Sequence, residues 1–598
     1  MFYTDIIYLL LALVFFGSWP SEGLYLSPLE ILLLWCLKEL VFVGLAVVFL
    51  RKTVTPASFL RRQSYLKIIA FLFFAIDVFA LDFPALVGLF LPTGWPFLRD
   101  FLGLLLFLQY LIVLWTVSAF YETRASLTKI STFQYVMAHL RLLLPFLVPW
   151  LLVNALLEGT LNFWGQDLFA PYQEQIELFY ILVFVLSLVV MVPPISVRVW
   201  QCIPLPESHL RNLIQDYLES QGTRVREILL WGAFEGRLIT AGVIGLFRRF
   251  RYLLLTPGLL AALEEPEVLS VVAHEVGHLK RRHMWWLLLF FLSFAVLTYA
   301  LLPLIYLAFW AYFPLTGDLL TFDLSYVPEI VLSIFMLVLI FFYFRILFGI
   351  YLRNFERQAD LYCLESLGTA EGLIRSLQKI AALSGRTERL PSWHHGSIAE
   401  RIEFLRAATA NPVLIKRHHF KVRLLLVSYL AIVFILTLWA WYAPRQRLER
   451  AANLNYWKAE VLERVKIFPN VDDLLLLAEI ALEQGREVEA IGYYEKARKL
   501  APRNPQVLNN LAWLLIKTKE RAFYDPKRAV HLAIKAVMAS PLATYLDTLA
   551  EGWFVLGDTN RACLYETLAL SRARDAPDFY PRLEFYRQQK ERFCRVTR

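Results

Sequence analysis

The chain has 598 residues, and its composition excludes an ordinary soluble protein: 58% of the residues are hydrophobic, 46 are phenylalanine and the mean hydropathy is +0.52. Much of its surface must therefore face lipid. The net charge of +9 is largely explained by Lys and Arg residues beside the apolar stretches, which would contact anionic headgroups, so nucleic-acid binding is not indicated.

Nine apolar stretches are predicted to be membrane-spanning helices, since a helix needs about 17 to 25 apolar residues to cross a bilayer. They are residues 3–19, 29–50, 65–91, 100–121, 142–157, 176–198, 284–312, 328–351 and 424–443. The first lacks the basic start and the cleavage site of a signal peptide. Charged residues inside the second and third stretches predict buried ion pairs, placement at the membrane interface, or a wet cavity leading to the active site: Lys38, Glu39, Asp77 and Asp82.

Basic residues gather in alternate loops. The loops after the second and fourth stretches carry Arg51, Lys52, Arg61, Arg62, Lys67, Arg124, Lys129 and Arg141, whereas residues 20–28, 158–175 and 313–327 contain no Lys or Arg. By the positive-inside rule the basic loops are cytoplasmic. The same alternation places residues 199–283 and 352–423 in the cytoplasm and the region after the ninth stretch outside.

The sequence His274-Glu-Val-Gly-His278 predicts a zinc site. Two histidines four residues apart share one face of a helix, so both can bind one zinc ion while Glu275 faces the water on the metal. Met284 stands ten residues after His274, where one class of zinc peptidase has a third histidine, so that class is excluded. His283 lies off the shared face and is expected outside the ligand set or at the surface.

The third ligand is expected from the helical extension that follows the eighth apolar stretch. Glu356 can reach back to the metal, and Asp360, one turn further on, could orient a ligand imidazole through its distal nitrogen. The alternative is that both carboxylates belong to a charged helix end at the membrane interface. One zinc ion per chain is expected.

These segments resemble a known family. His274-Glu-Val-Gly-His278 and the downstream Glu356-x-x-Ala359-Asp360 look like the zinc metallopeptidase family of the CAAX prenyl protease and the bacterial heat-shock membrane protease HtpX. The resemblance covers about residues 175–410. It implies a zinc held by His274, His278 and Glu356, with Glu275 as the general base that passes the water's proton to the leaving amine.

A third segment, residues 393–402, is similar to the family's His-Pro-x-x-x-x-Arg-Ile element. His395 and Arg401 have the matching spacing, and Gly396 replaces the usual proline. The resemblance implies that His395 stabilises the developing oxyanion and that Arg401 lies just outside the ligand set.

The resemblance also reaches a strand, a turn and a helix start at residues 252–260. In relatives an Asn-Ala pair lies along the bound peptide, and Thr240-Ala241 occupies the aligned place here. A substrate peptide is expected to add as an extended strand beside residues 251–255, in contact with Leu253 and Leu254.

The region after the ninth stretch has a soluble, helical pattern. Residues 471–504 read as one tetratricopeptide-type repeat of 34, a second begins near Pro505 with a longer interhelix turn, and a third follows and then degenerates. The repeats would bury a shared core and hold a protein partner or an unfolded substrate, with a purely structural cap as the alternative.

Five cysteines, Cys36, Cys202, Cys363, Cys563 and Cys594, have no C-x-x-C spacing. They indicate neither a disulfide framework nor a thiolate zinc site. Cys563 and Cys594 could pair if their region is exported.

The expected fold is an all-α polytopic membrane protein with a small α+β gluzincin-type catalytic subdomain and a C-terminal α-solenoid. The expected domains are a multi-span region at 1–175, a membrane metallopeptidase domain at 176–420 with catalytic segments 200–283 and 352–410, a last span at 424–443 and a repeat domain at 450–598.

The expected function is zinc-dependent endopeptidase activity at the cytoplasmic surface of a bacterial inner membrane. Its expected substrates are misfolded or damaged membrane proteins, which it would degrade as part of quality control. The repeats are expected to lie in the periplasm. One alternative is an intramembrane-cleaving metalloprotease, although the charged residues Glu264, Glu265, Glu267, Lys280, Arg281 and Arg282 around the motif favour the membrane edge. The other is a non-catalytic membrane scaffold that acts through the repeats.

Overall fold

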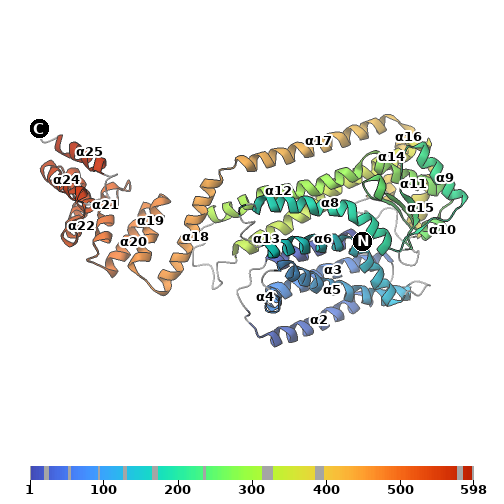
Figure 1. Ribbon diagram of the computed structural model, residues 1–598, viewed down its shortest axis with the longest axis horizontal. Helices are drawn as coiled ribbons and strands as arrows, with labels where there is room; N and C mark the ends of the chain where they lie inside the picture. Colours follow the sequence, from blue (N-terminus) through green and yellow to red (C-terminus); the bar gives the residue numbers. More distant parts are fainter. Residues whose placement is uncertain are drawn as a thin grey trace. The chain divides into compact units, whose positions relative to one another are not determined.

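The computed structural model describes residues 2–18, 24, 26–51, 56–91, 95–125, 131–164, 171, 173–232, 238–312, 327–383, 396–575 and 583–595. Helices dominate, and a small sheet lies near the middle of the sequence (Figure 1). The chain divides into two compact units, one made of Met1–Ala300 and Glu329–Trp439 and the other of Leu301–Pro328 and Ala440–Arg598.

Seven helices of the described residues are long and apolar enough to span a membrane. Their apolar ranges are Pro28–Arg51, Pro96–Tyr121, Thr132–Phe163, Phe179–Val199, His283–Tyr312, Val331–Leu367 and Val413–Tyr442. The chain is thus a multi-pass membrane protein.

Two of the nine predicted stretches do not meet this criterion. Residues 3–19 fall in α1 (Phe2–Ser18), a shorter apolar helix. The stretch 65–91 is divided between α3 (Pro56–Phe79) and the short α4 (Phe83–Gly88), with Asp82 capping α4 through the N–H of Ala85. Charged residues, among them Lys67 and Asp77, lower the hydropathy of α3.

The first helices of this unit share one apolar core that is rich in Phe and Leu. They are α1, α2 (Pro28–Arg51), α3, α4, α5 (Pro96–Ala125) and α6 (Thr132–Trp164). The helix α8 (Gln173–Val199) follows them in the chain. Lys38 pairs with buried Asp77, and Lys67 pairs with buried Asp5. For Lys38 and Asp77 the buried-pair alternative is therefore correct.

A four-stranded sheet carries the catalytic part of this unit. The strands β1 (Ile203–Pro204), β2 (Glu227–Leu230), β3 (Ala241–Ile244) and β4 (Tyr252–Leu255) lie in the order β1-β2-β4-β3. β2 and β4 are parallel, and both outer pairs are antiparallel. Successive side chains of β4 point to opposite faces of the sheet. Leu253 packs in the core that contains Val272, and Leu254 packs in a smaller core beside Trp200.

The helices of the catalytic part are α9 (His209–Ser220), α10 (Pro257–Ala262), α11 (Glu265–Lys280), α14 (Phe348–Leu367), α15 (Glu371–Leu383) and α16 (Ile398–Ala410). A capping box between Glu264 and Glu267 starts α11, and Arg282, with a φ of 58°, ends it. The membrane helix α12 (His283–Tyr312) follows directly. α13 (Val327–Ile340) runs through the π-helical turn Phe341–Leu347 into α14, and α17 (Val413–Tyr442) follows α16.

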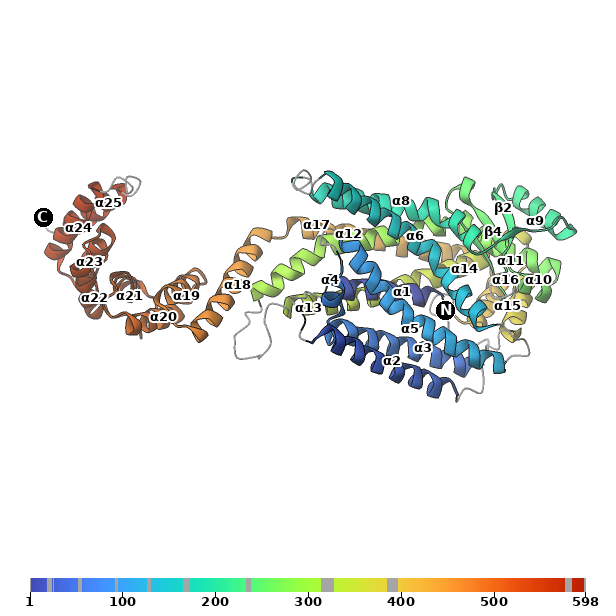
Figure 2. The same ribbon diagram turned by 60° about the horizontal axis from the view of Figure 1, so that its bottom comes forward.

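The second unit contains consecutive helices that Figure 2 shows along a curved row. They are α18 (Arg445–Ile467), α19 (Val471–Glu483), α20 (Glu487–Leu500), α21 (Pro505–Lys517), α22 (Pro526–Ala539), α23 (Ala543–Val555), α24 (Thr559–Arg574) and α25 (Leu583–Cys594). Small residues of these helices are fully buried and let neighbouring helices pack closely: Ala478, Ala490, Ala512, Ala533, Ala550 and Ala562. Gly485 and Gly557 follow α19 and α23 with φ of 72° and 86°, the left-handed conformation that ends a helix.

Cys563 and Cys594 form a disulfide between α24 and α25. The described cysteines of the other unit, Cys36, Cys202 and Cys363, are free thiols. The pairing that the sequence allowed only for an exported region is therefore present in the second unit.

Candidate metal centre

The site forms where α11 and α14 touch. A Cβ added at Gly277 would lie 3.0 Å from the Cα of Ala359 and 3.0 Å from the Cβ of Tyr362. Glycine on one helix and alanine on the other therefore let the two backbones approach closely. This contact brings Glu356, one turn before Ala359, within reach of the two histidines on α11.

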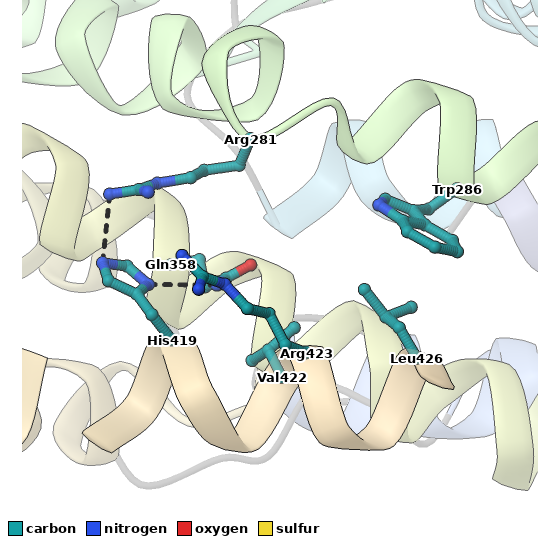
Figure 3. A pocket seen from close by; sticks show the side chains of 7 residues that line it. All are labelled: Arg281, Trp286, Gln358, His419, Val422, Arg423 and Leu426. Carbon is teal, nitrogen blue, oxygen red and sulfur yellow. Dashed lines mark hydrogen bonds between the residues drawn. The ribbon is translucent and has the colours of Figure 1, made fainter. Parts of the chain in front are cut away.

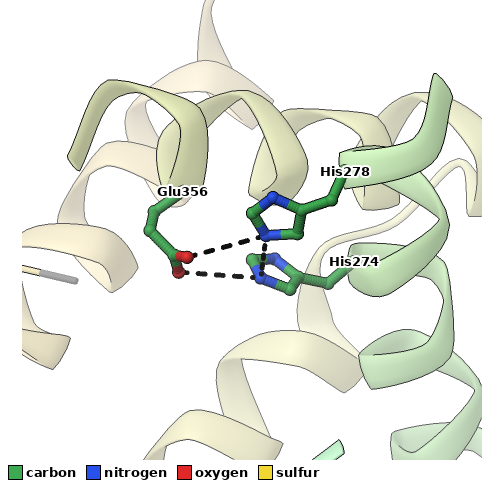
Figure 4. A group of neighbouring side chains, drawn as sticks. All are labelled: His274, His278 and Glu356. Atoms are coloured by element: carbon green, nitrogen blue, oxygen red, sulfur yellow. Dashed lines mark hydrogen bonds and ion pairs between the residues drawn. The ribbon is translucent and has the colours of Figure 1, made fainter. Parts of the chain in front are cut away.

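His274, His278 and Glu356 converge from these two helices (Figure 4). The Nε2 atoms of the histidines are 3.2 Å apart, and they lie 3.7 Å and 3.6 Å from the two oxygens of Glu356. A tetrahedral zinc with bonds of about 2.1 Å separates its ligand atoms by about 3.4 Å. The spacing and the donor types both fit one zinc ion with a further position open.

Two buried charges support the ligands from behind. Nδ1 of His274 lies 2.8 Å from Oδ1 of Asp360. Arg401, on α16, donates to both oxygens of Asp360 over 2.9 Å and 2.6 Å, and its remaining nitrogen lies 3.3 Å from Glu356. His274, Glu356, Asp360 and Arg401 are all buried, so these charges interact with little screening by water.

Burial and charge act against each other on these groups. Burial alone would lower the pKa of His274, but the hydrogen bond to Asp360 and the charge of Asp360 outweigh it and raise that pKa above its ordinary value. Burial also disfavours charge on Arg401, yet Asp360, then Glu356 and more weakly Glu275, raise its pKa. Arg401 therefore stays cationic beside the carboxylates.

A chain of hydrogen bonds leads from His278 away from the metal position; we call His278, His283, Gln358, His419 and Glu365 the relay. Nδ1 of His278 lies 3.0 Å from Nδ1 of His283, and Nε2 of His283 lies 3.0 Å from Oε1 of Gln358. The amide nitrogen of Gln358 is 3.0 Å from Nδ1 of His419, whose Nε2 is 3.3 Å from Glu365.

One arrangement of protons satisfies the relay from His278 to Gln358. If Nε2 of His278 binds metal, its Nδ1 carries the proton and donates to His283, and His283 then donates to Oε1 of Gln358. At the far end, Nε2 of His419 lies 3.0 Å from Nη2 of Arg281 as well as 3.3 Å from Glu365, so the guanidinium, which can only donate, competes with the carboxylate for that nitrogen. Within the first part, the arrangement would hold His278 in the tautomer that a metal requires.

His283 is buried against Phe355, with ring centroids 4.3 Å apart, and not at the surface. Gln358 and His419 were not identified from the sequence. Gln358 lies two residues after Glu356, but no sequence pattern indicates that α17 would pack here and supply His419.

The other predicted residues are placed as follows. Glu275 is half-buried on α11, next to His274. His395 lies outside the described residues. Leu253 and Leu254 are buried in β4, which has a strand on each side. The expectation that a peptide adds directly beside residues 251–255 is therefore wrong, because β4 is an interior strand; the edge strands of the described sheet are β1 and β3, and Thr240 and Ala241 lie at the start of β3.

The comparisons with known proteins agree with this site in part. Residues 210–409 match the family model described as Peptidase family M48, and this range contains His274, His278, Glu356, Asp360 and Arg401. No curated protein matches. The chain is also similar to the crystal structure of Ste24p from S. mikatae, with 15% identity, a TM-score of 0.34, and coverage of 67% of this chain and 98% of that one. Residues 210–409 thus match the peptidase family M48, the family expected from the motifs.

Proposed function

We propose that this membrane metallopeptidase is a zinc-dependent endopeptidase that cuts peptide bonds at the cytoplasmic membrane surface. The observation that carries the proposal is the spacing of His274, His278 and Glu356, whose donor atoms lie 3.2 Å to 3.7 Å apart. A zinc ion bound by these three residues would lower the pKa of a coordinated water to about 7 and would polarise the scissile carbonyl.

Protein side chains would perform the remaining steps. Glu275 would accept the water's proton and deliver it to the leaving amine. Asp360 and Arg401 would hold His274 and Glu356 in place, and His395 would assist as negative charge develops on the carbonyl oxygen. The guanidinium of Arg401, 3.3 Å from Glu356, would also help to hold that carboxylate in position.

The substrate would add to the free edge of β3. The backbone N–H of Thr240 donates to Oγ1 of Thr256, and the carbonyl of Thr240 accepts from Thr256, so both groups are already occupied on the β4 side. In an antiparallel pair such occupied residues alternate with residues that face outward. Ala241 and Val243 would therefore offer their backbone groups to an extended peptide, largely independently of its sequence.

The repeats would lie on the opposite side of the membrane from the zinc. The disulfide Cys563–Cys594 supports this, because disulfides persist in oxidising compartments such as the bacterial periplasm. The free thiols of Cys202 and Cys363, in the catalytic part, suit the reducing cytoplasm. In a bacterial inner membrane the repeats would recruit a partner or a damaged membrane protein for degradation.

The decisive experiment combines metal content with proteomics. Membranes carrying the wild-type chain should accumulate cleavage products that are missing with Glu275→Gln, while both purified proteins hold one equivalent of zinc. Equal products from both would sink the proposed mechanism and favour the scaffold alternative. Products cut within spans would favour the intramembrane protease instead.

A further inference from the structure

A cavity of about 160 Å³ opens beside the end of the relay (Figure 3). Its walls come from the end of α11, from α14, and from the membrane helices α12 and α17. The residues that line it are Arg281, Trp286, Gln358, His419, Val422, Arg423 and Leu426.

The cavity lies at the membrane boundary. Trp286 is the fourth residue of α12, and the apolar part of α17 begins just after Arg423. The preceding turns of α17 carry Lys416, Arg417, Lys421 and Arg423. Such a basic segment directly on the cytoplasmic side of a span attracts anionic lipid headgroups.

On the polar side of the cavity, carboxylates of the described residues only partly balance the positive charges of Arg281 and Arg423. Arg281 pairs with Glu365 over 2.5 Å, but its Nε is buried without a hydrogen-bond partner in the described part of the chain. Arg423 is exposed, and the described residues provide it with no ion pair. Two guanidinium groups facing one small cavity suit a phosphate, which can accept several N–H donors at once.

The opposite side of the cavity is apolar. Val422 and Leu426 are buried one turn apart on α17, and Trp286 faces them from α12 (Figure 3). A free phosphate would leave this apolar wall uncovered, whereas the first carbons of an acyl chain would cover it. We propose that this cavity binds the headgroup of an anionic phospholipid, with its phosphate between Arg281 and Arg423.

The bound lipid would act on the metal centre through the relay. A phosphate at Arg281 would compete with Glu365 and with Nε2 of His419 for that guanidinium, and both of these residues stand at the end of the relay. A change at Glu365 is passed to His278 through His419, Gln358 and His283. Lipid binding and metal binding are then coupled, and each alters the affinity for the other by the same factor.

The test uses the purified full-length chain, delipidated in neutral detergent and titrated with dioctanoyl-phosphatidylglycerol while its thermal unfolding is followed. Dioctanoyl-phosphatidylcholine and inorganic phosphate are titrated in parallel. Arg423→Gln is the test variant. Arg417→Gln is its control, because Arg417 is exposed on the same helix and does not line the cavity.

Phosphatidylglycerol should stabilise the wild type and Arg417→Gln alike, and Arg423→Gln should bind it at least about fivefold more weakly, as expected for one lost cation near a headgroup. Phosphatidylcholine and inorganic phosphate should stabilise the chain much less. Equal losses in both arginine variants, or equal effects of the two lipids, would overturn the proposal, and binding of phosphate as tight as that of phosphatidylglycerol would mean a site for free phosphate. Glu275→Gln should bind lipid like the wild type, so a failure of the proposed peptidase activity remains distinguishable.

Discussion

The carboxylate of Asp360 lies 2.8 Å from Nδ1 of His274, so the opposite nitrogen of that ring points toward His278 and Glu356. Asp360 is itself held by two hydrogen bonds from Arg401. The orientation of a metal ligand thus depends on residues from three helices, α11, α14 and α16. Partners of this kind fix the tautomer of a ligand histidine and make it a stronger base.

Replacing Asp360 by Asn should therefore weaken zinc binding by about 10- to 100-fold. The change removes the negative acceptor of His274 and leaves Arg401 buried with half of its ionic partners. Zinc affinity can be measured by competition with a chromophoric chelator. Glu371→Gln, an exposed carboxylate at the start of α15, is the control and should bind zinc normally; an unchanged affinity in Asp360→Asn would contradict this role.

Replacing Gly277 by Val should separate α11 from α14 and cost about 1–3 kcal/mol of stability. The new side chain would meet the backbone of Ala359, which cannot yield as a flexible side chain could. Thermal unfolding and zinc content should both fall. Gly492→Val on α20 is matched in chemistry but meets no atom within 4 Å, so it should lack the packing cost and keep the zinc. Full zinc occupancy in Gly277→Val would show that the helix contact does not set the site.

Replacing Gln358 by Leu should break the relay in its middle and raise the zinc dissociation constant about tenfold. The leucine has a similar volume but can neither accept a hydrogen bond from His283 nor donate one to His419. Gln358→Glu restores the acceptor for His283 and should recover most of the affinity. Equal zinc affinity in all three proteins would mean that the relay is only packing.

The helices α23 and α24 should become less stable as pH rises. Glu566 is fully buried, and burial together with the neighbouring Asp547 raises its pKa above the ordinary 4.5. The folded state therefore keeps a proton that the unfolded chain releases above pH 4.5, so stability is highest below that pH and falls toward the raised pKa, by up to about 1.4 kcal/mol per pH unit. Lys517 and Arg592 pair with Glu551 nearby.

Hydrogen exchange of α23 and α24 at pH 6 and pH 8, corrected for intrinsic rates, measures this dependence. Glu566→Gln should flatten it, and Glu584→Gln, exposed on α25, should not. If α23 and α24 of the wild type had the same exchange protection at pH 6 and pH 8, Glu566 would be ionised in the folded protein.

The disulfide should stabilise the packing of α25 on α24. Removing a crosslink between residues 31 apart in the sequence should cost about 3–4 kcal/mol of stability, because the unfolded chain is then no longer constrained. Exchange protection of α25 should drop in Cys563→Ser with Cys594→Ser, while the zinc content stays unchanged. Alkylation of unreduced cells followed by mass spectrometry should leave Cys563 and Cys594 unmodified; modification of both would contradict an oxidising location.

The metal motif was predictable because its information is local or separated by recognisable spans. His274 and His278 are one helical turn apart, and Glu356 with Asp360 has the same spacing on a second helix. The helix pairs of the second unit were predictable because small residues recur where helices must touch. The expected fold class, a polytopic helical membrane protein with a small α+β part, is confirmed for the helices and the sheet.

The rest depends on contacts between distant segments. Four short strands do not reveal their order, so the edge position of β3 and the interior position of β4 could not be read from the residues. Of the two places expected for His283, outside the ligand set or at the surface, the first is correct, because the turn at Arg282 brings its ring against His278. The end of α3 was counted as a span because its apolar residues outnumber Lys67 and Asp77, whose partners lie on other helices.

The most direct test of the zinc site is zinc-edge X-ray absorption on the purified full-length chain. The account predicts about one zinc per chain, bound by two imidazole nitrogens and a carboxylate oxygen at about 2.0–2.2 Å, with the carboxylate contribution lost in Glu356→Gln. A correctly folded chain without zinc, or a spectrum with sulfur ligands at about 2.3 Å, would contradict it.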